Sequence, residues 1–171
     1  MGLHERLRGL IAYDAMAYNG PERDAQATRN VQAFATAGDP IGSQIMAAWQ
    51  DLAQGRGLGM DALQRLLPAY FKDFRRIDAS LAAWKKTAGM TVDPNRKESR
   101  WDIRDRLGEI AVPTLVIVGA ADFISPENSA RDLAEGIPGA EFVILKDSGH
   151  FGHVEEPETF RDAVLRFIAA H

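Results

Sequence analysis

The stretch Pro113-Thr-Leu-Val-Ile-Val-Gly-Ala-Ala-Asp-Phe-Ile-Ser-Pro126 decides the fold of this chain. Its aliphatic run from Leu115 to Val118 predicts a strand that is covered on both faces, as in a parallel sheet. Asp122 follows just past the carboxyl end of this strand, where open α/β sheets bind their ligands. The sequence therefore predicts an α/β fold with an acid at the functional edge of its sheet.

A second stretch, Ser148-Gly-His-Phe-Gly-His-Val-Glu-Glu-Pro157, places His150 in a loop after the next predicted strand, 140–145. A carboxylate can hold an imidazole in one tautomer, and histidine is the usual general base near neutral pH. We therefore expect Asp122 and His150 to lie within hydrogen-bonding distance as orienting acid and base. Taken separately, Asp122 could be a turn residue and His150 a surface residue.

Metal chemistry is the competing interpretation of the histidine loop. His150 and His153 are followed by Glu155 and Glu156, but this spacing matches no strong ligand motif. The chain has no cysteine, which excludes disulfides, thiol catalysis and cysteine-ligated metal. We therefore expect no metal and no cofactor, with His153 at the wall of the cleft or at the surface.

The rest of the chain supplies one more strand and many helices. Residues 8–14 predict a short strand, which gives three parallel strands at 8–14, 113–119 and 140–145, with 113–119 in the middle. Apolar residues at helical spacing fill residues 24–106, and the charged run 96–106 predicts a solvated helix with an Asp102–Arg106 pair. Gly55, Gly57 and Gly59 lie between predicted helices, which favours a connection over a phosphate loop.

Composition limits the classes of function. The 171 residues suffice for one domain, with 46% hydrophobic and 26% charged residues and a net charge of −4. Basic residues are interspersed with acidic ones, so no nucleic-acid partner is expected. The sequence offers no long apolar run and no signal peptide, so we expect no membrane partner and a cytoplasmic protein.

These segments together resemble the α/β-hydrolase family, in its lid-bearing group of proline iminopeptidases, lactonases and small-ester hydrolases. The stretch 113–126 resembles the acid-bearing strand and loop of that family, and 148–160 resembles its histidine loop and last helix. His4 to Ile11 resembles the strand that follows the nucleophile helix. The resemblance implies a core strand in residues 1–15, a helical lid in 16–106 and a C-terminal core in 107–171.

The chain departs from the family in its nucleophile. In the family, several strands, part of the oxyanion hole and the serine elbow precede the strand that resembles 8–14. The 171 residues of this sequence contain no Gly-x-Ser-x-Gly, the motif of that elbow. The chain therefore resembles the C-terminal part of such an enzyme, with two members of a triad. None of its serines has the expected flanking glycines; they are Ser43, Ser80, Ser99, Ser125, Ser129 and Ser148.

Two functions remain open at this point. In the first, the chain is the Asp–His portion of a hydrolase that acts on a small-molecule ester, lactone or amide, with its serine supplied by other sequence or by another chain. In the second, it is a non-catalytic module that binds a partner through the uncovered edge of its sheet. That bare edge at 8–14 predicts self-association into a homo-oligomer, in the simplest case a homodimer.

Overall fold

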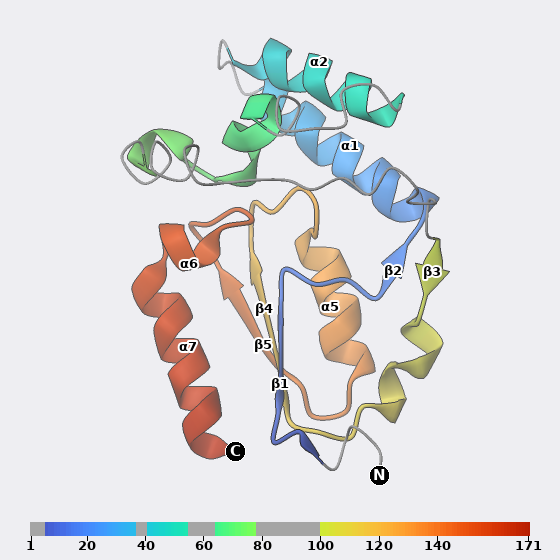
Figure 1. Cartoon of the computed structure of the whole chain (residues 1–171), viewed down its shortest axis with the longest axis vertical. Coiled ribbons are helices and arrows are strands. Elements are labelled where there is room, and N and C mark those ends of the chain that lie inside the picture. The colour runs from blue at the N-terminus through green and yellow to red at the C-terminus, as the bar shows by residue number, and fades with distance from the viewer. Residues whose placement is uncertain (1–5, 37–40, 55–63, 78–99) are drawn as a thin grey trace.

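A computed structural model describes residues 6–36, 41–54, 64–77 and 100–171 of the chain. Figure 1 shows a sheet in the centre of the lower part of the view, with helices beside both of its faces. Further helices lie across the end at which the strands finish. The fold is therefore α/β, as predicted.

The sheet contains β1 (Leu10–Tyr13), β4 (Thr114–Gly119) and β5 (Glu141–Leu145). Its order is β1-β4-β5, and both pairs of neighbours are parallel. All three predicted strands are thus present, and the strand at 113–119 is in the middle, as predicted.

Both faces of β4 are covered, which explains its unbroken aliphatic sequence. Val116 and Val118 pack with α5 (Glu127–Gly136), and Leu115 and Ile117 pack with α7 (Pro157–Ala170). Every residue of β4 is buried. Because the central strand is held on two faces and two edges, the loop that follows it starts from a fixed position.

A second group of helices packs over the carboxyl ends of the strands. It contains α1 (Pro21–Thr36), α2 (Gly42–Ala53) and the 3₁₀ helices η2 (Leu67–Tyr70) and η3 (Phe74–Ile77). Their buried cluster includes Val31, Ile45 and Phe123, so it reaches the loop after β4. The role of 16–106 as a lid stays a prediction, and the connection at Gly55–Gly59 lies outside the described residues.

The structure corrects the helix expected over 96–106 from residue 100 onward, since 96–99 lie outside the described residues. Trp101–Asp102 is a strand, β3, that pairs antiparallel with β2 (Tyr18–Asn19), and a 3₁₀ helix, η4, spans Arg104–Glu109. Asp102 pairs with Arg104 at 2.6 Å, while Arg106 pairs with Glu109 at 2.8 Å, so the Asp102–Arg106 prediction was wrong. The charge pattern could not reveal β2 as a partner strand, because that contact joins residues far apart in sequence.

None of the described helices has the length and the apolar composition that a membrane crossing requires.

Candidate active site

Asp122 lies in the loop directly after β4 and is fixed by three hydrogen bonds. Its Oδ1 accepts from the backbone N–H groups of Ile124 at 2.8 Å and Ser125 at 3.0 Å. Its Oδ2 lies 2.9 Å from Nδ1 of His150, within the hydrogen-bonding distance that the sequence predicted. The Asp122 side chain is fully buried, so this bond is shielded from water.

His150 is held at both ends of its backbone. Its N–H donates to the carbonyl oxygen of Tyr70 at 2.7 Å, and its carbonyl oxygen accepts from the Tyr13 hydroxyl at 3.0 Å. Because Nδ1 is bonded to Asp122, Nε2 is the ring nitrogen that can take a proton from a reactant. The side chain is 24% exposed, so it is oriented and yet accessible.

The histidine loop is tied to its neighbours by two carboxylates. Glu155 accepts from the backbone N–H of Gly149 at 2.6 Å and from those of Lys72 at 2.9 Å and Asp73 at 3.1 Å. Glu156 accepts from the Asp147 N–H and the Ser148 hydroxyl, both at 2.7 Å. Glu155 thus bonds backbone donors, and Glu156 bonds a backbone and a hydroxyl donor, so both carboxylates position the loop.

The environment of His150 favours its protonated form. Burial alone disfavours the imidazolium, but the hydrogen bond and charge of Asp122, together with the charge of Asp14, outweigh burial and raise the pKa of His150. The site is therefore suited to accept a proton and to hold it while a reaction proceeds.

Asp14 is the member of this site that the sequence analysis missed. It follows β1 directly, and its Oδ2 lies 3.8 Å from Nδ1 of His150. Burial, and then the charge of Asp122, raise the pKa of Asp14 to about 8. A signal was available: Asp14, like Asp122, comes just past the carboxyl end of a predicted strand, and parallel strands end at one edge of the sheet.

The three side chains also define where a cation could bind. Ligand atoms of Asp14, Asp122 and His150 lie within 4.8 Å of one another. A cation there would have to displace the hydrogen bond between Asp122 and His150, because the other carboxylate oxygen of Asp122 already accepts two backbone hydrogen bonds. His153, considered as a ligand from the sequence, has its Nδ1 3.1 Å from the Tyr13 hydroxyl.

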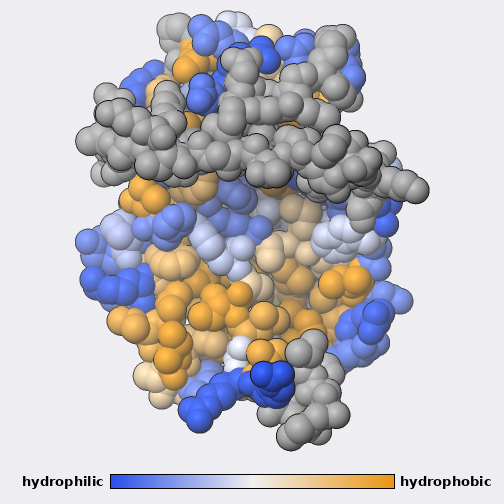
Figure 2. All heavy atoms as spheres, viewed as in Figure 1, coloured by the Kyte–Doolittle hydropathy of each residue, from blue (hydrophilic) through white to orange (hydrophobic). Residues whose placement is uncertain are grey.

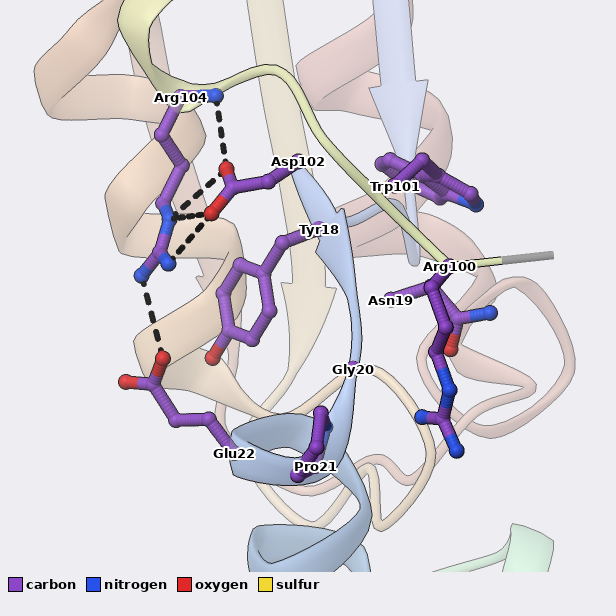
Figure 3. Close-up of a pocket in the computed structure, with 9 residues that line it drawn as sticks. All are labelled: Tyr18, Asn19, Gly20, Pro21, Glu22, Arg100, Trp101, Asp102 and Arg104. Atoms are coloured by element: carbon purple, nitrogen blue, oxygen red, sulfur yellow. Dashed lines mark hydrogen bonds and ion pairs between the residues drawn. The ribbon is translucent and has the colours of Figure 1, made fainter.

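A pocket lies at the β2–β3 ribbon, and none of these residues lines it. It has a volume of about 340 Å³ and is lined by the ribbon, the start of α1 and Arg104. Figure 3 shows the Arg104 guanidinium between the carboxylates of Asp102 and Glu22, beside the Tyr18 ring. These cations and anions pair with each other, so the pocket's charges stabilise the ribbon.

Comparison with known proteins places the chain in a family. The family described as "alpha/beta hydrolase fold" matches residues 16–157, so the chain belongs to the α/β-hydrolase family.

The similar proteins are longer than the part that matches this chain. RutD of Rhizobium rhizogenes is 43% identical over 70 residues, which are 41% of this chain and 27% of RutD. A 2-hydroxy-6-oxononadienedioate/2-hydroxy-6-oxononatrienedioate hydrolase of Klebsiella pneumoniae is 40% identical over 68 residues, 40% of this chain and 24% of that protein. The crystal structure of the enol-lactonase from Burkholderia xenovorans superposes with a TM-score of 0.61 at 22% identity and supports the fold. It covers 96% of this chain, and this chain covers 57% of it.

Proposed function

We propose that this chain carries the acid and the base of a hydrolase active site, with His150 as the general base and Asp122 as the residue that orients it. The observation that supports this most directly is the 2.9 Å contact between Oδ2 of Asp122 and Nδ1 of His150 at the end of the central strands. Membership of a hydrolase family supports the reaction class.

The proposed reaction is acyl transfer to water on a small ester, lactone or amide. Nε2 of His150 takes the proton of a hydroxyl nucleophile as that oxygen attacks the carbonyl carbon, and then returns the proton to the leaving group. In a second step, His150 activates water in the same way and the acid product departs. The names of the Klebsiella hydrolase and the Burkholderia enol-lactonase support a small carbonyl substrate.

The nucleophile belongs to no recognisable motif of these 171 residues, because they contain no Gly-x-Ser-x-Gly. We therefore assign it to a polypeptide segment outside this sequence that packs beside β1. Losing a triad nucleophile lowers turnover by about 10⁶-fold. The chain by itself should consequently show no triad-level hydrolysis.

Hydrolysis of p-nitrophenyl acetate, with a serine-directed fluorophosphonate as probe, tests this assignment. The isolated chain should hydrolyse the activated ester slowly through His150 acting on water, and should lose this activity in His150→Ala. His171→Ala is the matched control and should keep it. The assignment of the nucleophile is wrong if one serine is labelled stoichiometrically and its replacement by alanine removes activity; unchanged hydrolysis in His150→Ala would contradict the role of the base.

A non-catalytic, self-associating module is the second candidate, and one observation favours it. Within the described residues β1 pairs only with β4, so its other edge offers unpaired backbone groups. Ile11 on this strand is 37% exposed and Leu7 beside it is 50% exposed. Figure 2 shows apolar side chains gathered on the face where Figure 1 places β1.

In this second proposal, the partner at the free edge of β1 is another copy of the chain, and the two β1 strands pair across a two-fold axis. Light scattering at micromolar concentration should then give a dimer, and Ile11→Lys should shift it to a monomer. Leu165→Lys, an exposed position on α7, is the control and should remain dimeric. A monomer for the unaltered chain would overturn the proposal.

A further inference from the structure

We propose that Asp14 is a second acid of this site, a positioning residue that shares with Asp122 the electrostatic control of the His150 imidazolium. The proposal rests on the proposed role of His150 as a base, and extends it to a residue on a different strand. Oδ2 of Asp14 is 3.8 Å from Nδ1 of His150, whereas Oδ2 of Asp122 is 2.9 Å from the same atom. Both carboxylates are therefore on the Nδ1 side of the ring, away from the nitrogen that would meet a reactant.

The burial of Asp14 makes its charge depend on His150. Its side chain is only 6% exposed, and within the described part of the chain its Oδ1 is buried with no hydrogen-bond partner. Hydrogen bonds of this carboxylate with the Tyr13 side chain and the Gly119 backbone favour its ionised form, but burial outweighs them. An ionised carboxylate so placed is costly unless a positive charge lies nearby. The imidazolium of His150 is such a charge, so Asp14 is stabilised as an anion when His150 holds a proton and as a neutral acid when it does not.

The backbone at Asp14 supports a fixed position for this carboxylate. Its φ is +47°, in the left-handed region that costs most residues strain but that aspartate and asparagine tolerate best. Its N–H donates to the carbonyl oxygen of Ile117 at 3.0 Å, which continues the pairing of β1 with β4. Asparagine suits the same backbone, so Asp14→Asn removes the charge with little change of shape.

Coupling between the Asp14 carboxyl and the His150 ring should be visible in the titration curves of both groups. Two groups that interact strongly lose their protons in steps that belong to the pair. The His150 ring and the Asp14 carboxyl should therefore report the same two steps. The other groups around His150 are Asp122 after β4, Tyr13 on β1, Tyr70 of η2 and His153 of α6 (Gly152–Glu155).

NMR titration of the whole chain tests the proposal, with the His150 ring and the Asp14 side-chain carboxyl carbon as probes. In the unaltered chain both curves should show the same two midpoints. Asp14→Asn should leave one midpoint for His150, at lower pH, because a negative charge has been removed. His150→Gln should leave a single step for Asp14. Asp122→Asn should lower the His150 midpoint further, and adding Asp14→Asn to it should lower it again.

The proposal is overturned if Asp14 titrates in one step, with a midpoint unaffected by His150→Gln. It is equally overturned if Asp14→Asn leaves the His150 curve unchanged, or if chelation with EDTA changes the curves, since a bound cation would then explain the cluster. Should Asp14→Asn fail to fold, the two curves of the unaltered chain still decide. None of these readouts requires turnover, so the hydrolase proposal can fail in the ester assay while this one stands.

Discussion

Gly119→Ala is expected to separate His150 from Asp122, because the last residue of β4 has no room for a side chain. A Cβ atom there would lie 1.9 Å from the carbonyl oxygen of Gly149 and 2.7 Å from that of Ser148. Both oxygens belong to the backbone of the loop that carries His150. No side-chain rotation can relieve the contact, so one of the two backbone segments must move.

The required movement is larger than the site can absorb. Ordinary contact begins at 3.4 Å, so the segments must separate by about 1.5 Å. β4 is buried along its whole length, so the histidine loop moves and the 2.9 Å bond to Asp122 breaks. Overpacking costs about 1–3 kcal/mol and loss of a charged hydrogen bond about 1.5–3 kcal/mol, so the free energy of unfolding should fall by roughly 2.5–6 kcal/mol.

Urea unfolding of the variant and a matched control measures this difference. Gly108→Ala is the control, because a Cβ atom at Gly108 meets nothing within 4 Å. It should unfold within about 0.5 kcal/mol of the unaltered chain. In folded Gly119→Ala the His150 ring should also titrate at lower pH, since its contact with Asp122 is lost. Equal stability of the two variants, or an unchanged His150 midpoint in Gly119→Ala, would refute the steric argument.

Three further changes have defined outcomes. Asp14→Asn should stabilise the chain at pH 8, because folding raises the pKa of Asp14 from 3.8 to about 8. The contribution of Asp14 to stability is therefore full below pH 3.8 and is lost progressively as the pH rises to 8, so urea unfolding should show a larger difference between variant and parent at pH 8 than at pH 5. Glu155→Gln replaces an acceptor of three backbone N–H groups and should cost roughly 1–3 kcal/mol, with faster amide exchange at Gly149 as the local readout. Tyr13→Phe removes the hydroxyl that donates to the His150 carbonyl oxygen and should cost about 1 kcal/mol in the same unfolding assay, while an unchanged value would show that the bond adds nothing.

The sheet could be predicted because its signals are local. Leu115 to Val118 form an aliphatic run, and Asp122 and His150 each follow a strand, so pattern alone places both side chains at one edge. The bond between them then required only that the strands be neighbours, which the β4–β5 pairing provides.

The parts that escaped prediction depend on contacts between distant residues. β2 and β3 are two residues each and become strands only because they meet, with Arg104 stacked on Tyr18 at 4.3 Å. Asp14 carried a local signal, but its importance arises from the proximity of His150 and Asp122, which no spacing in the sequence displays. Short strands and buried charges are thus the features for which tertiary contacts override local pattern.

The segment around Tyr70 has a structural role that limits how much of the predicted lid can move. Its carbonyl oxygen accepts the N–H of His150 at 2.7 Å, and its ring packs edge-on against the His150 ring. Gly149 permits this approach, since a Cβ atom there would lie 2.5 Å from the Tyr70 oxygen. Displacing this segment would release the backbone of His150 and disturb its alignment with Asp122. If residues 16–106 act as a lid, the opening movement must therefore occur elsewhere in that region, while residues 67–71 stay with the histidine loop as part of the site's fixed framework.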